Sequence, residues 1–444
     1  MAAGDPVFWH RLQFAFTIVY HYLFPQLTMG LALLIFVMKG LGLRSGDTRW
    51  DDAARFWIRI FGLNFAVGVV TGIPMEFQFG TNWARFTELA GGVVGHTLAM
   101  EGLFAFFLES SFLSLLVWGE KRLGRKGHFL ASAALLVGSW LSGWFIVCTN
   151  AFMQHPVGHT VGPDGVLHLA SFWTFVLNPW AIAAYVHTMI AAVVTGSFVV
   201  AAVGAYYALR GVHLDAATRF LRVGTTVGLV ASFLVAFPTG DRQTKLVARH
   251  QPVALAAMEG RFASGANAGI TLIGQPNVAE RRLDNPIEIP GMLSFLAYGT
   301  FHRGVAGLDA FPESEWPDNI ELLYYAFHVM AGLGTIFIAL MAVAAVLSWR
   351  GALATTRSVL WVLMLAFPFP YSANTAGWMT AELGRQPWIV YGILRTRDAA
   401  SPSVHSGTVL FTLIGFTGIY LVLGLLFLFL VLRELEHGPV TLHG

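Results

Sequence analysis

The stretch TAELGRQPW, residues 380–388, places Glu382 and Arg385 directly after a long apolar run. Charged side chains are costly beside hydrocarbon, so a charge at this position indicates a functional site. Glu101 and Glu109 also lie in an apolar stretch, eight residues apart. On a helix they would be about 80° apart around the axis and about 12 Å apart along it. They could line one proton-conducting track, since such relays use Glu and His; the alternative is two structural hydrogen bonds.

Four histidines, His21, His96, His187 and His328, lie in or at the edges of separate apolar stretches. Each could make an interhelical hydrogen bond or ligate a metal. Haem iron accepts His or Met as an axial ligand. Met330, in FHVMAGLG, could be such a ligand or a core side chain.

The histidine pattern argues against two redox classes. A haem–copper oxidase would need several helix histidines, usually with an adjacent pair, and the sequence contains no HH. A two-haem cytochrome b would pair histidines on the same helix. The single cysteine, Cys148, excludes an intrachain disulfide and Cys-ligated zinc or iron–sulfur sites.

The composition is that of a polytopic membrane protein. The 444 residues are 56% hydrophobic and 12% charged, whereas soluble domains carry about 25% charged residues. No basic tract suits phosphates, so we expect no nucleic-acid partner. The first residues, MAAGDPVFWHRLQ, are too polar for a secretory signal, so the first apolar span is expected to be retained.

Apolar stretches of about 20 residues predict membrane-crossing helices. The fold class is therefore all-α, a membrane bundle with nine transmembrane helices. The predicted spans are 14–38, 56–76, 95–118, 127–150, 181–209, 217–239, 322–349, 357–380 and 407–433.

Lysine and arginine predict the orientation, because they are enriched in cytoplasmic loops. The loops after spans one, three, five and seven carry thirteen of them, whereas 77–94 and 151–180 carry only Arg85. The N-terminus is expected outside and the C-terminus inside. The thirteen are Lys39, Arg44, Arg49, Arg55, Lys121, Arg122, Arg125, Lys126, Arg210, Arg219, Arg222, Arg350 and Arg357.

A long connection, 240–320, lies on the predicted outer side and is rich in Pro, Gly and charge. Connections of this length are commonly functional or disordered. We divide the chain into helices one to six (1–239), this loop, and helices seven to nine (321–444). A proton-coupled transporter with Glu101, Glu109 and Glu382 as a relay is the rival, but we find no matched halves with discontinuous helices.

Seven stretches, in one order along the chain, resemble subunit I of the cytochrome bd family of quinol oxidases. They are RLQFAFTIVYHYLFPQLTMG, TGIPMEFQFGTNWARF, LAMEGLFAFFLESSF, AYVHTMIAAVVTG, QPVALAAMEG, FHVMAGLG and AGWMTAELGRQPW. The resemblance implies that His21 binds a high-spin haem and that His187 and Met330 are the axial ligands of a low-spin haem b. It implies that Glu382 ligates the iron of the other high-spin haem.

The resemblance also implies the surroundings of these haems. Arg385 would lie near haem propionates, with which a guanidinium can pair bidentately. Trp378 would pack against a porphyrin edge or serve in the interfacial aromatic belt. His328 stands where relatives can carry arginine, so its imidazole either replaces that pairing or weakens it.

The loop is expected to bind quinol. Glu259 matches the family's important glutamate and is expected to accept the quinol proton from a short helical segment, LAAMEGRF; the alternative is a solvated loop carboxylate. Ala254 replaces a common lysine, which leaves open a relative that uses another electron donor. The loop is of the short type, as in the cyanide-insensitive branch.

The implied activity is oxidation of ubiquinol or menaquinol at the outer face and reduction of dioxygen to water. Protons would come from the cytoplasm by way of Glu109 and Glu101, without a pump. The implied cofactors are two haem b and one haem d, or three haem b. A second large subunit, a small single-helix subunit and membrane lipid are the expected partners, in the bacterial cytoplasmic (inner) membrane.

Overall fold

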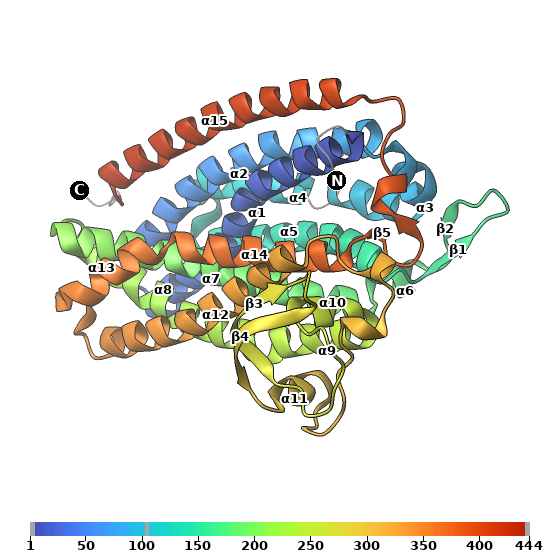
Figure 1. Ribbon diagram of the computed structural model, residues 1–444. Helices are drawn as coiled ribbons and strands as arrows, with labels where there is room; N and C mark the ends of the chain where they lie inside the picture. Colours follow the sequence, from blue (N-terminus) through green and yellow to red (C-terminus); the bar gives the residue numbers. More distant parts are fainter. Residues whose placement is uncertain (1–4, 103–105, 440–444) are drawn as a thin grey trace.

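The computed structural model describes residues 5–102 and 106–439, which form one elongated bundle of helices lying side by side (Figure 1). The helices are α1 Pro6–Ser45, α2 Arg49–Thr81, α3 Ala84–Met100, α4 Phe106–Trp118, α5 Glu120–Gln154, α6 Phe172–Val176, α7 Pro179–Arg210, α8 Leu214–Leu234, α9 Asp241–His250, α10 Pro252–Met258, α11 Met292–Tyr298, α12 Ile320–Trp349, α13 Arg357–Ala366, α14 Pro368–Arg385 and α15 Ser406–His437.

Within these described ranges, eight helical segments are long and apolar enough to cross a membrane. The predicted span 95–118 corresponds to α3 and α4, on either side of residues 103–105, which lie outside the described residues. The prediction of a membrane-spanning helical fold is confirmed. The number nine and the orientation stay predictions.

Local sequence signals account for the helix ends. Asn178 caps α7, because its side chain accepts a hydrogen bond from the Ala181 amide at 2.9 Å, and Pro179 follows at the first helical position. The same helix ends at Gly211, whose left-handed backbone (φ 69°) suits glycine.

Two helical boundaries differ from the sequence prediction. Helix α8 continues through a π-helical turn, Val235–Gly240, into α9, so the helical path extends to His250 and the loop proper starts later than residue 240. The predicted span 357–380 is two helices, α13 and α14, which meet at Phe367 and Pro368. Proline removes a backbone donor and interrupts the helix there.

Three small antiparallel hairpins accompany the helices and were not foreseen in an all-α chain. They are β1 His159–Val161 with β2 Leu167–Leu169, β3 Ile270–Asn277 with β4 Arg282–Ile289, and β5 Trp388–Val390 with β6 Leu394–Arg395. The β3–β4 hairpin belongs to the long loop, with α10 and α11.

The bundle has its main core where α1, α2, α7 and α8 meet, around the fully buried Phe56, Trp57 and Phe220. Helix α15 lies on the outside of the bundle, packs mainly along α1 and α2, and leaves most of its membrane-spanning length unburied (Figure 1). Helix α1 begins at one end of the bundle and α15 ends at the other.

Candidate functional site

His21 on α1 is oriented by a threonine on α2. Its Nδ1 lies 3.1 Å from the Thr71 hydroxyl, which donates its own proton to the Val67 carbonyl at 2.9 Å. With its proton on that carbonyl, the hydroxyl would accept from Nδ1–H, in the tautomer that leaves Nε2 unprotonated. Gly72 follows the threonine; a Cβ there would lie 2.9 Å from His21 Cε1, so only glycine lets the ring lie this close.

His187 on α7 has the same arrangement. Its Nδ1 lies 3.0 Å from the Thr239 hydroxyl, which donates to the Val235 carbonyl at 3.0 Å in the π-helical turn. Gly240 follows this threonine as well, with its Cβ position 3.8 Å from His187 Cε1. A ligating histidine typically donates its other ring N–H in this way, which fixes the tautomer.

Met330 lies where α12 packs against α14. A Cβ on Gly377 of α14 would lie 2.8 Å from the Met330 sulfur, so this glycine makes room for the thioether. Helix α14 also contacts α7. The helices that carry Met330, His187 and Glu382 therefore adjoin one another.

The Glu382 carboxyl group accepts hydrogen bonds from three donors. Its Oε1 accepts from Asn150 at 2.6 Å and from Gln154 at 3.4 Å, both on α5, and its Oε2 accepts from Arg385 at 2.5 Å. The Glu382 side chain nevertheless stays 37% exposed. Its carboxylate thus has an open side on which a further ligand could bind.

Arg385 has donors left over. Its side chain is only 5% exposed, and its Nε and Nη1 have no hydrogen-bond partner among the described residues. Unpaired buried donors cost free energy. An anionic group beside Glu382 would satisfy them.

Glu101 and Glu109 both face α5. The Ser142 hydroxyl donates to Glu101 at 2.9 Å, and the Ser139 hydroxyl donates to Glu109 at 2.5 Å. The two serines are three residues apart and therefore share a face of α5. The structure thus brings both carboxylates to one helix face. His96 lies on α3 and hydrogen-bonds the Val93 carbonyl of the same helix at 3.3 Å.

Glu259 is buried at the C-terminal end of α10, so the alternative of a solvated loop carboxylate was wrong. Burial raises the pKa of its carboxyl to about 8; the Thr271 N–H, 3.3 Å from Oε2, lowers it, and the nearby Glu288 adds to the increase. A carboxyl with this pKa can exchange a proton near neutral pH. Of the predicted helical segment LAAMEGRF, only residues 255–258 are helical, as the end of α10, and Glu259 is the residue that follows the helix.

Three more residues from the sequence analysis, His328, Trp378 and Ala254, each make a contact between two elements. His328 donates to the Thr271 carbonyl at 2.9 Å and so ties α12 to the loop. Trp378 on α14 makes an edge contact with Tyr22, the neighbour of His21, with ring centroids 5.7 Å apart. Ala254 is buried, 3.3 Å from a Cβ built on Gly384, so a lysine in its place would enter a packed contact.

These residues fit haem better than a bare metal ion. Among the described residues, no three His, Cys, Asp or Glu side chains converge as a protein-only metal site requires. A metal bound at His21, His187 or Glu382 must therefore bring ligands of its own.

The comparisons with known proteins match these features. The sequence description of the family "Cytochrome bd terminal oxidase subunit I" matches residues 9–439. The chain belongs to this family. It is similar to cytochrome bd ubiquinol oxidase subunit 1 of Bacillus subtilis, with 34% identity covering 96% of this chain and 93% of the relative. Cytochrome bd-II ubiquinol oxidase subunit 1 of Escherichia coli is 32% identical, over 98% and 97% of the two chains.

A solved structure agrees over the whole length. The bd oxidase from Geobacillus thermodenitrificans superposes with a TM-score of 0.91 and 31% identity, covering 99% of this chain and 100% of that one. This cytochrome bd chain is therefore a terminal oxidase subunit of the bacterial cytoplasmic membrane, and its family implies haem and a subunit II. The transporter alternative is not favoured.

Sequence reasoning missed the small polar residues that hold the acids and histidines. They are Thr71, Thr239, Ser139, Ser142, Asn150 and Gln154. A signal was present: Thr71 and Thr239 each precede a glycine within an apolar span.

Proposed function

We propose that this cytochrome bd subunit holds haem iron at three places. His187 and Met330 would hold a low-spin haem b, and His21 and Glu382 the two high-spin haems. The observation that carries this is the repeated Thr–Gly arrangement, in which Nδ1 of His21 and of His187 lies within hydrogen-bond distance of a threonine hydroxyl, so that Nε2 would be the nitrogen that binds iron. Arg385 would pair with propionates, with Trp378 packed nearby. The set would be two haem b and one haem d, or three haem b.

Bound haem supplies electron transfer and dioxygen chemistry; the chain supplies ligands, burial and proton transfer. Glu259 would accept a proton from quinol, either ubiquinol or menaquinol, bound in the loop region 240–320. Gln251 of this loop donates to the Gln154 carbonyl at 2.8 Å, and Gln154 in turn donates to Glu382. This chain of hydrogen bonds ties the loop to the Glu382 site. His328 would add a second tie beside Met330.

Glu109 and Glu101 would carry protons from the cytoplasmic side along α5 to the site of oxygen reduction. Ser139 and Ser142 hold these carboxylates in place. Uptake on one side and release from quinol on the other would separate charge without a pump. Helices of 1–239 and 321–444 would form the haem bundle, and a small single-helix subunit and lipid would complete the complex.

The test uses two methionines of α12. Met330→Leu preserves volume and apolarity, so it should remove the low-spin band from the reduced-minus-oxidised spectrum and abolish quinol-driven oxygen uptake. Met341→Leu, at a buried position on the same helix, is the matched control and should change neither. An unchanged low-spin spectrum in Met330→Leu would show that this ligand assignment is wrong.

A further inference from the structure

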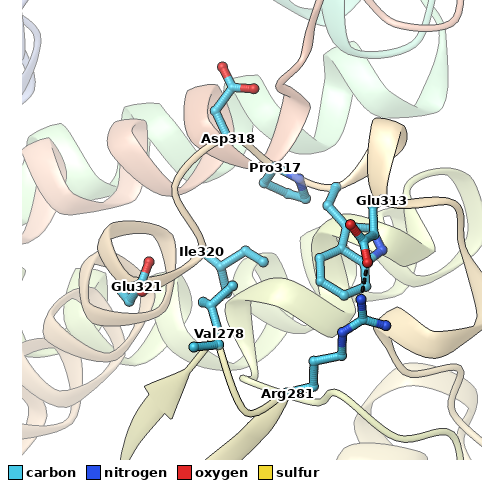
Figure 2. Close-up of a pocket in the computed structure, with 9 residues that line it drawn as sticks. Val278, Arg281, Glu313, Pro317, Asp318, Ile320 and Glu321 are labelled. Atoms are coloured by element: carbon cyan, nitrogen blue, oxygen red, sulfur yellow. Dashed lines mark hydrogen bonds and ion pairs between the residues drawn. The ribbon is translucent and has the colours of Figure 1, made fainter. Parts of the chain in front are cut away.

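The β3–β4 hairpin lies lengthwise along α12, and three contacts define its direction. Val278 and Arg281, at the turn, line a cavity of about 400 Å³ together with Ile320 and Glu321 at the start of α12 (Figure 2). Further along, a Cβ on Gly274 would lie 3.0 Å from the Tyr324 hydroxyl. At the open end, the Thr271 carbonyl accepts from His328 at 2.9 Å.

These three α12 residues, Ile320, Tyr324 and His328, are four residues apart and so share one face of the helix. From Ile320 to His328, the hairpin follows α12 over about 12 Å of the helix axis. Between Glu321 and Arg350 the sequence of α12 has no Asp, Glu, Lys or Arg. His328 is thus about two turns inside the uncharged part of a membrane-spanning helix, and the open end of the hairpin reaches that depth.

The exposed side chains of the hairpin differ in polarity between the turn and the open end. The turn carries Glu280, Arg281 and Arg282, which are charged and exposed. The open end exposes four apolar residues: Leu272 (51%), Ile273 (58%), Ile287 (55%) and Ile289 (42%). One acid, Glu288, is also exposed there, and it pairs with Thr271 on the adjacent strand. Ile273 and Ile287 are directly paired across the strands.

An outer face formed by apolar side chains is not typical of a sheet in contact with water. An antiparallel sheet with one face on the protein and one in water alternates apolar-in and polar-out. Here the inner face carries Thr271 and Glu288 and covers Glu259, whereas the outer face is formed by the four apolar side chains. The outer face therefore meets an apolar medium.

The surroundings of the patch point to lipid as that medium. The adjoining helix α12 exposes Tyr325, Val329 and Ile336 along its membrane-spanning length. Beyond β4, the stacked rings of Phe295 and Phe301 are also exposed, with centroids 4.7 Å apart. Exposed aromatic rings are typical of the membrane–water interface.

We propose that the outer face of the β3–β4 hairpin at its open end, formed by Leu272, Ile273, Ile287 and Ile289, is immersed in the lipid leaflet on the loop's side of the membrane. The charged turn stays in water. A single strand then separates Glu259 from lipid. The proposal depends on the membrane-spanning assignment of α12 and is independent of the quinol and haem roles.

Cysteine labelling of the assembled oxidase in native membranes tests this. Ile273→Cys and Ile287→Cys should react with a charged maleimide at least about tenfold more slowly than Glu280→Cys and Arg282→Cys, because thiolates form in water and not in hydrocarbon. The control positions are matched in exposure, since 58% of Ile273 and 57% of the Glu280 side chain are exposed. The unmodified protein provides the blank, because Cys148 is buried. Equal rates at the four positions would overturn the proposal.

Nitroxides on the same cysteines, with the oxidase in phospholipid bilayers, distinguish lipid from a protein partner. In lipid, the labels at 273 and 287 should collide often with oxygen and rarely with a charged nickel chelate. Frequent collisions with both would place the face in water, and rare collisions with both would place it under another subunit; either result overturns the proposal. Leu272→Cys replaces any variant whose haem spectrum shows that it did not assemble.

Discussion

His21 and His187 lie on different helices, yet each hydrogen-bonds a threonine that is followed by a glycine. A threonine hydroxyl that donates to its own helix can accept from Nδ1–H of the ring. The ring is thereby held with Nε2 pointing away from the threonine. This contact is too small to recognise from residue types alone, but it decides which nitrogen is free to bind iron.

Removing one of these hydroxyls should weaken the iron site without unfolding the helix. Thr239→Val retains the shape of the side chain, and loss of such an outer contact typically costs about 10- to 100-fold in metal affinity or activity. We expect a shifted midpoint potential and lower occupancy of the low-spin haem. Thr71→Val should affect a high-spin haem instead. Redox titration of each band checks this, and identical titrations in both variants and the wild type would contradict it.

Glu259 should control quinol oxidation and its pH dependence. Its pKa is raised to about 8 by burial, so the carboxyl is protonated below that pH and can accept a quinol proton only above it. Quinol-driven oxygen uptake should therefore rise as the pH increases through about 8. Glu259→Gln should abolish this uptake and leave the haem spectra intact.

The control supplies electrons to Glu259→Gln from an artificial donor that bypasses the loop. Oxygen uptake should then recover. If the variant is equally inactive with this donor, the defect lies at the haems and the loop is not the quinol site.

At the scale of elements, close helix crossings position the ligands. Helices α1 and α7, which carry His21 and His187, meet at Gly30 and Gly196. A Cβ on Gly30 would lie 2.2 Å from the Ala192 carbonyl oxygen, a backbone atom. Small residues at such crossings let helix backbones approach within a membrane.

Gly30→Ala should therefore force α1 and α7 apart. Overpacking typically costs about 1–3 kcal/mol, so we expect a lower thermal midpoint and reduced haem content. Gly62→Ala, on α2, has nothing within 4 Å of its new Cβ and is the matched control. Equal midpoints and haem contents for the two variants would show that the crossing does not need glycine.

For the whole molecule, the distribution of Lys and Arg predicts which side faces the cytoplasm. Ser45, the last residue of α1, should lie inside, and Asp164, between β1 and β2, should lie outside. We expect a membrane-impermeant maleimide to label Asp164→Cys in intact cells, and Ser45→Cys only in inverted vesicles. The reverse result would place the N-terminus inside.

The amino-acid sequence by itself determined the membrane class, because apolar runs long enough to cross a bilayer are visible without any structure. It also indicated the acids and histidines, since charge within such runs is costly and its presence is informative. The first half of the predicted helical segment LAAMEGRF was likewise visible in the local pattern, and it forms the end of α10.

Only the tertiary structure decided which groups meet. Thr71, Ser139 and Asn150 look like ordinary polar residues in the sequence, and their partners are 30 to 232 residues away. Glu259 could be read as solvated until the hairpin was seen to cover it. The extension of the helical path through α9 depends on packing, since α9 contacts α7, α10 and α11. The break before Pro368, in contrast, follows from the proline itself. Local sequence patterns set helices, but burial and pairing over long separations belong to the folded chain.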